Sequence, residues 1–259
     1  MTVLVLFVLP ASARGQQWQD KPEIGRLFEK AGAVGTFVVF DCKAGRLTGH
    51  DRIRAETRFL PASTFKIPNS LIGLSAGAVA DVDEPLPYGG RPQMMKAWEK
   101  DMGLREAIRI SNVPIYQELA RRIGLERMRS ELQRLNYGNG DVGSQVDSFW
   151  LEGPLGISAA EQVSFLSRLA KGELPLPREA QAAVREILLL ESGPGWSLYA
   201  KTGAALRDGC GIGWWVGWLE KGDEVYPFAI NLDIRNLDAD GPKRTALPRA
   251  ALKLLGLME

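Results

Sequence analysis

The stretch FLPASTFKIPNSLIGLSAG, residues 59–77, lies where the sequence changes from strand-forming to helical. Upstream of it, GTFVVFDCKAG at residues 35–45 has the β-branched and aromatic residues of a strand, followed by a turn. Within it, Pro68 is tolerated only near the first turn of a helix, which predicts that a helix begins at Ser63. Ser63 and Lys66 would then share one face of that helix.

The segments that follow are predicted to be mostly helical as far as about residue 190. Examples are SNVPIYQELARRIG and SAAEQVSFLSRLAKG, which carry apolar residues at helical spacing. In the second, Ser158 and Glu161 have the spacing of a capping box. Beyond them, SLYAKTG, CGIGWWVGWLE and EVYPFAINLDI have the composition of strands, and an amphipathic helix is expected from about Arg244 to Leu257.

Strands near both chain ends with helices between them predict an α+β fold. A helix at residues 20–32 and a short strand at RLTGHD, residues 46–51, complete the N-terminal part. We expect an antiparallel sheet formed from both ends and flanked by helices, with an inserted all-helical domain. The sheet domain would comprise residues 14–62 and 191–259, the helical domain residues 63–190, and the active site would lie at their interface.

The overall composition favours a small ligand. The chain has 259 residues, 45% of them hydrophobic, and a net charge of +1, so nothing in it suggests a nucleic-acid partner. With His50 as the single histidine and two cysteines, no metal site is expected. His50 lies in the polar stretch LTGHDRI, where we expect an exposed turn residue rather than the base of a serine triad.

The first residues, MTVLVLFVLPASARG, combine an apolar run with an Ala-Ser-Ala site. This pattern predicts a signal peptide at residues 1–13, too short to anchor the chain in a membrane, and export to a periplasm. A buried N-terminal strand is the alternative. In such a compartment Cys42 and Cys210 could form a disulfide, although two small apolar residues are the favoured interpretation.

Ser63 and Lys66 have the chemistry of a nucleophile and its base. A serine hydroxyl is a weak nucleophile that needs a base, and Phe65 and Ile67 provide apolar surroundings in which a lysine loses its proton. A helix start also leaves the Ser63 N–H free to bind an oxyanion. The alternative is a helix N-cap beside a surface lysine, which the spacing alone does not exclude.

Further motifs follow in a fixed order: SNV at residues 111–113, FWLEGPLGIS from Phe149, and KTG at residues 201–203. Together with PASTFKIPNS, MKAWEKD and WWVGW, they resemble the class D serine β-lactamases, the oxacillinase family. The resemblance covers essentially the whole mature chain. It implies a β-lactamase/transpeptidase-like fold and hydrolysis of the β-lactam amide of penicillins, of oxacillin type and beyond, which confers antibiotic resistance.

By this resemblance Ser63 is acylated, and Lys66 reacts with CO2 to become an N-carboxylated lysine that acts as general base. CO2 or bicarbonate would be needed, with no other cofactor. Trp150 would hold the carbamate through its indole N–H, with a core tryptophan as the alternative. Glu152 would be the deacylating base in a class A enzyme, but in the class D pattern it is structural.

The remaining implied site residues bind substrate or move protons. Ser111 would pass a proton to the leaving nitrogen, or else cap a helix. Val113 and Leu151 would keep the lysine pocket dry, or else be core residues. The substrate's carbonyl oxygen and carboxylate would be bound by Lys201, Thr202, Gly203, the backbone N–H of Ala204, and Arg244, which fits the family position better than Lys243.

Three other functions share parts of this pattern: the β-lactam sensor domain of a receptor, a penicillin-binding transpeptidase or carboxypeptidase, and a non-enzymatic binding module. The first two acylate without turnover of the antibiotic. A β-lactam is therefore the expected small-molecule partner, with no nucleic acid or membrane anchor. The sequence fits a monomer or a homodimer.

Overall fold

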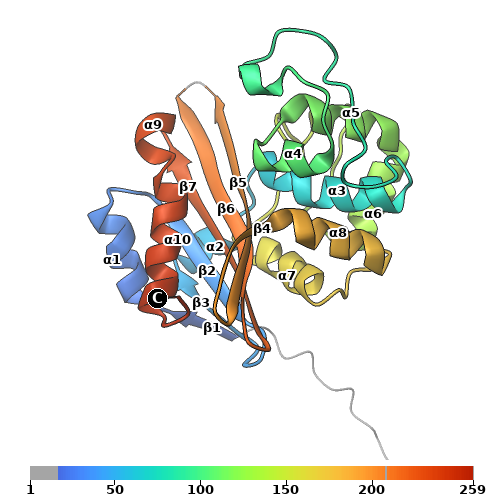
Figure 1. The fold of residues 1–259 in the computed structure, drawn as a ribbon. Coiled ribbons are helices and arrows are strands. Elements are labelled where there is room, and N and C mark those ends of the chain that lie inside the picture. Colours follow the sequence, from blue (N-terminus) through green and yellow to red (C-terminus); the bar gives the residue numbers. More distant parts are fainter. Residues whose placement is uncertain (1–16, 208, 259) are drawn as a thin grey trace, which may run out of the picture.

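The computed structural model describes residues 17–258 apart from Asp208 (Figure 1). Its strands are β1 (Gln17–Asp20), β2 (Gly35–Asp41), β3 (Arg46–His50), β4 (Leu189–Gly193), β5 (Trp196–Arg207), β6 (Cys210–Lys221) and β7 (Glu224–Ile234). Its helices are α1 (Pro22–Lys30), α2 (Arg52–Glu56), α3 (Lys66–Ser75), α4 (Leu104–Arg109), α5 (Val113–Ile123), α6 (Leu125–Leu135), α7 (Ala159–Ala170), α8 (Arg178–Leu188), α9 (Leu237–Asp240) and α10 (Lys243–Leu254). Two 3-10 turns, η1 (Ala62–Phe65) and η2 (Lys96–Trp98), complete the described elements.

The strands form one sheet in the order β1-β3-β2-β7-β6-β5-β4. The two ends of the chain meet at β2 and β7, where Val38 lies opposite Ala229, which confirms the sheet formed from both termini. Neighbouring strands are antiparallel except β1 and β3, which run parallel. The sheet is therefore mixed rather than wholly antiparallel as predicted.

The two faces of the sheet belong to two apolar cores, and β6 contributes to both. Trp214, Val216 and Trp218 point into the larger core, which continues into the helices. Trp215 and Leu219 point into the smaller core, on the face covered by α1 and α10 (Figure 1). This alternation follows from the two-residue period of a strand. α7 packs on β2, β6 and β7 on the larger core's side.

The helices and strands predicted from long periodic segments are confirmed, including the capping box in which the Ser158 hydroxyl accepts from the Glu161 N–H at 3.1 Å. The short strands β1 and β4 and the short helix α2 were not predicted. The division into a sheet domain and a helical domain stays a prediction, since the larger core runs through both parts.

The structure corrects the expectation for His50 and shows the state of the Cys42 thiol. His50 is not an exposed turn residue: it ends β3, is half-buried, and packs its ring against Phe28 at 5.4 Å. Cys42 is a free thiol whose Sγ contacts Ser167 Oγ at 3.2 Å. The predicted signal peptide lies outside the described residues. None of the described helices is both long and apolar enough to cross a membrane.

Candidate active site

Ser63 and Lys66 are in direct contact where the 3-10 turn η1 passes into α3. Lys66 Nζ donates a hydrogen bond to Ser63 Oγ at 3.0 Å. The sequence predicted an α-helix starting at Ser63, whereas the structure begins with a 3-10 turn at Ala62. In that tighter turn, side chains three residues apart eclipse one another, which brings the hydroxyl and the amine together.

The Lys66 side chain is completely buried, at 0% exposure. Its Nζ lies 5.2 Å from the centre of the Tyr116 ring, whose hydroxyl bonds Ser70. Burial, with a smaller contribution from the charge of Lys201, holds the pKa of Lys66 well below its ordinary value of 10.5. Lys66 therefore has the character of a neutral amine, which is able to accept a proton or attack an electrophile.

Trp150 lies against the same turn. Its ring stacks on Phe65 with 5.2 Å between centroids, and its carbonyl accepts a hydrogen bond from the Ala62 N–H at 3.0 Å. Its indole Nε1, although buried, has no hydrogen-bond partner among the described residues. Because a buried donor left unpaired costs about 1–3 kcal/mol, this N–H is available for an acceptor placed beside it.

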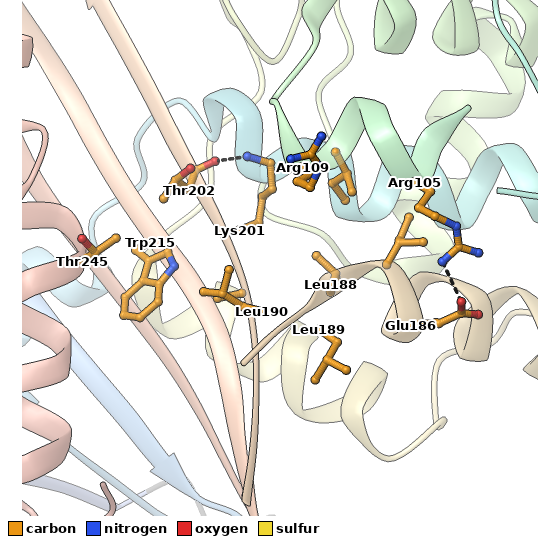
Figure 2. A pocket seen from close by; sticks show the side chains of 13 residues that line it. Arg105, Arg109, Glu186, Leu188, Leu189, Leu190, Lys201, Thr202, Trp215 and Thr245 are labelled. Atoms are coloured by element: carbon orange, nitrogen blue, oxygen red, sulfur yellow. Dashed lines mark hydrogen bonds and ion pairs between the residues drawn. The ribbon is translucent and has the colours of Figure 1, made fainter. Parts of the chain in front are cut away.

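A second serine–lysine contact lies on the strand side of the site. Lys201 Nζ donates to Ser111 Oγ at 3.0 Å and to the Thr202 carbonyl at 2.8 Å, the latter drawn in Figure 2. Burial, followed by the charge of Arg244, lowers the pKa of Lys201 to about 7. Ser111 is not the cap of α5: Asn112 accepts from the Ile115 N–H at 3.1 Å in that role.

The backbone is strained at Ser111 and at Ala62, the residue before Ser63. Ala62 has a φ of 49° and Ser111 a φ of 58°, in the left-handed region that residues with a Cβ avoid. Each such residue costs about 1–3 kcal/mol, and such costs concentrate at functional sites. Asp51 and Asn136 also have a positive φ, so strain alone does not identify the site, but two of the four such residues described lie in the turns that present Ser63 and Ser111.

β5 passes directly beside the turn that carries Ser63. A Cβ on Gly203 would lie 3.0 Å from Thr64 Cγ2 and 3.1 Å from the Pro61 carbonyl oxygen, so any larger residue would require this turn to move back by a few tenths of an ångström. Arg244 on α10 lies behind the same strand. Its guanidinium donates to the carbonyls of Gly203, at 3.0 Å, and Gly241, at 2.9 Å, which fixes a cation at the edge of the site.

Trp214 is a residue of this site to which the sequence analysis gave no role. It lies opposite Gly203 on β6, and its indole Nε1 donates to the Leu60 carbonyl at 2.8 Å. It thereby ties the nucleophile turn to the sheet. The sequence signal for this contact is the WWVGW motif together with the need of a buried indole N–H for an acceptor.

The other predicted residues lie around this centre without a polar side-chain contact to it among the described residues. Val113 is the first residue of α5 and is half-buried. Leu151, also half-buried, lines a cavity of about 550 Å³ that reaches Ala205 and Leu206. Thr202 and Ala204 follow Lys201 along β5. Glu152 is exposed, in keeping with a structural role.

No group of three His, Cys, Asp or Glu residues within the described part of the chain could hold a metal ion. The polar groups gathered at the site are instead two serines, two lysines, an arginine and an indole N–H. They are suited to acyl transfer, which needs a nucleophile with a base and benefits from a second hydroxyl beside a cation.

Known proteins share this fold and sequence. Residues 35–253 match the penicillin-binding protein transpeptidase domain family. The chain is 39% identical to β-lactamase OXA-5 of Pseudomonas aeruginosa, over 98% of this chain and 96% of that protein. It is 38% identical to β-lactamase OXA-48 of Klebsiella pneumoniae, over 96% and 94%.

Among solved structures, FUS-1 (OXA-85), a class D β-lactamase of Fusobacterium nucleatum subsp. polymorphum, superimposes with a TM-score of 0.90 at 44% identity. The alignment covers 93% of this chain and all of that one. The class D β-lactamase YbXI from Nostoc gives a TM-score of 0.88 at 41% identity, over 91% and 99%. The chain belongs to the class D β-lactamases, a family of hydrolases.

Proposed function

We propose that this chain hydrolyses the β-lactam amide of penicillins, including those of oxacillin type, through an acyl-enzyme on Ser63. The observation that carries the proposal is the 3.0 Å hydrogen bond between Lys66 Nζ and Ser63 Oγ, made by a lysine whose pKa burial has lowered. The general base, which we place on the Lys66 side chain, would accept the hydroxyl proton of Ser63 as its Oγ forms a bond to the carbonyl carbon. The ring C–N bond would then break.

Lys66 is proposed to act in its N-carboxylated form. Two features fit this modification: only a neutral amine attacks CO2, and the buried Trp150 N–H lacks an acceptor within the described residues. Lys66 would carry the carboxylate and Trp150 would donate a hydrogen bond to it. Carboxylated, Lys66 would supply the general base for both acylation and deacylation.

Ser111 and Lys201 are proposed to deliver the proton that the ring nitrogen needs as it leaves. Ser111 Oγ would donate it, and Lys201 Nζ, at 3.0 Å, would replace it. The N–H groups of Ser63 and Ala204 would bind the oxyanion. After acylation, water would attack the Ser63 ester and release the open-ring product, while Val113 and Leu151 limit the access of water.

An anionic substrate would lie along β5. Its carboxylate would contact Thr202, Lys201 and Arg244, and carboxylate recognition by arginine is strong. Its acyl side chain would point past Ala204 to the cavity of about 550 Å³ beside Leu151. The proposed setting is a periplasm, reached after cleavage at Ala13, in which turnover of the antibiotic confers resistance.

The first test is turnover of a chromogenic cephalosporin by the mature protein with and without added bicarbonate. We expect sustained turnover that bicarbonate increases and that Lys66→Ala abolishes. A single stoichiometric burst that bicarbonate does not extend would instead indicate a sensor domain or a transpeptidase.

The role of Trp150 has a separate test. Trp150→Phe keeps the ring that stacks on Phe65 and removes the N–H, so more bicarbonate should be needed for half-maximal activity. The carbamate carbon can be followed by NMR after addition of ¹³C-labelled bicarbonate. An unchanged signal and an unchanged bicarbonate requirement in Trp150→Phe would contradict the proposed contact.

A further inference from the structure

A cavity of about 410 Å³ opens beside the strand side of the active site (Figure 2). Lys201 and Thr202 line one part of it, and Leu189 and Leu190 at the start of β4 line another. β4 pairs with β5 only as far as Tyr199, so no described strand covers the edge of β5 at Ala200. The cavity therefore lies along this open edge, next to Lys201 and Thr202 of the candidate active site.

The charge on the cavity wall is positive and partly uncompensated. Arg105 is neutralised by Asp83 at 2.8 Å and by Glu186 at 2.6 Å. Arg109, one helical turn later on α4, is exposed and makes no hydrogen bond or ion pair with any described residue. Glu186, which pairs with Arg105, is the one acidic residue among the described residues that line this cavity. Asp83, Asp101 and Glu106 line a second cavity that Arg109 also borders, but none of them forms an ion pair with it.

The floor of the cavity is apolar. Leu189 and Leu190 are 48% and 51% exposed, two consecutive large apolar side chains at the surface. Ile108 and Ile187 extend this apolar surface toward α4 and α8. An apolar floor beneath a free guanidinium is complementary to an apolar group that ends in an anion.

The direction of the substrate connects this cavity to the reaction. In the proposed function, the reacting carbonyl lies between the N–H groups of Ser63 and Ala204 and the carboxylate at Thr202 and Lys201, so the ring would run along β5 toward lower residue numbers. The substituent on the ring atom next to the carboxylate-bearing atom would then point toward Ala200, which lines the cavity. It would leave the catalytic centre at the point where the cavity begins.

We propose that this cavity is a subsite for the ring substituent of a cephalosporin-type β-lactam, and that Arg109 selects substituents ending in a negative charge. The proposal rests on the proposed β-lactam hydrolysis and specifies its substrate class. Arg109 is a specificity residue here: it contacts the substituent and leaves the acylation chemistry to the serines and lysines.

The test uses two cephalosporins that share an acyl side chain and carry non-leaving ring substituents, one ending in a carboxylate and one in the matching amide. Arg109→Gln should lower kcat/KM for the carboxylate compound about threefold to fivefold, the range of an exposed ion pair, and leave the amide compound unchanged. Added salt should reduce the preference of the wild type. Arg109→Glu should reverse it.

Arg178→Gln is the matched control, because Arg178 is an exposed arginine at the start of α8 that does not line the cavity. Arg178→Gln should leave kcat/KM unchanged for both cephalosporins. Benzylpenicillin, which has only methyl groups at the corresponding ring position, should be hydrolysed equally by wild type and Arg109→Gln. Equal effects of Arg109→Gln on both cephalosporins, with penicillin turnover intact, would overturn the subsite alone. Absence of any β-lactam turnover in the wild type would overturn the proposed function.

Discussion

The active site contains two serine–lysine pairs with the same contact distance and different surroundings. Lys66 Nζ to Ser63 Oγ and Lys201 Nζ to Ser111 Oγ are both 3.0 Å. Lys66 is fully buried, and among the described residues its amine has Ser63 Oγ as its one hydrogen-bond partner. Lys201 is 6% exposed, also donates to the Thr202 carbonyl, and faces an open cavity.

Because the two contact distances are equal, they do not decide the charge of the two lysines; we expect the groups that surround each amine to decide it. Burial disfavours the charged form of both lysines. At Lys201, however, an arriving substrate carboxylate would favour the charged form again. Lys66 has apolar and aromatic neighbours instead, and would stay neutral until it is modified. In the proposed function, the same residue types would therefore supply the proton acceptor on one side and the anion-binding charge on the other.

Replacing each lysine by methionine should have the largest effect on activity and should separate the roles of the two lysines. Lys66→Met removes the base and should lower kcat about a thousandfold. Lys201→Met removes a charged hydrogen-bond donor and should lower kcat/KM for an anionic substrate about tenfold to a hundredfold, partly through KM. Steady-state kinetics with added bicarbonate measures both.

The response to bicarbonate is the control for this pair. It should persist in Lys201→Met and be absent in Lys66→Met, with both variants folded by circular dichroism. If the two variants lost the same activity and both still responded to bicarbonate, the assignment of separate roles would be wrong.

Trp214 links the turn that carries Ser63 to the sheet, and Trp214→Phe should lower kcat less than the lysine substitutions. The variant loses the hydrogen bond to the Leu60 carbonyl, so the turn that carries Ser63 is less firmly placed against Gly203. We expect kcat to fall about tenfold, since small misplacements of a nucleophile are costly. Trp218→Phe is the matched control, because its Nε1 donates to Glu220 Oε1 at 3.0 Å instead. Both variants should lose stability in urea unfolding, but an equal loss of kcat would contradict the positioning role.

The parts of the structure predicted correctly from the sequence are those that depend on residues close together in the chain. The strands around KTG and WWVGW, the helices with apolar residues at three- and four-residue spacing, and the Ser63–Lys66 contact each depend on neighbours within one turn or one strand. The pair was predicted for an α-helix and is made in a 3-10 turn, because both geometries bring such side chains together.

The parts that were missed depend on partners far along the chain. Trp214 and Leu60 are 154 residues apart, so no local pattern could assign that hydrogen bond. The short strand β1 has little pattern of its own and is defined by pairing with β3. Asn112, rather than Ser111, caps α5 because Ser111 adopts a positive φ that directs it to Lys201. Tertiary contacts decided each of these cases.

The smallest expected effect is on the pH dependence of stability. The pKa of Lys201 is about 7 in the folded protein, against 10.5 for an unperturbed lysine. Between these values the unfolded chain binds more protons, so Lys201 makes the free energy of unfolding increase as the pH rises through this interval and decrease as it falls. Lys201→Met should therefore show a shallower slope in urea unfolding across the interval, whereas Lys253→Met, at an exposed position of α10, should keep the wild-type slope. An unchanged slope in Lys201→Met would mean that this lysine stays protonated in the folded protein, and the contrast with Lys66 would then be sharper than burial alone predicts.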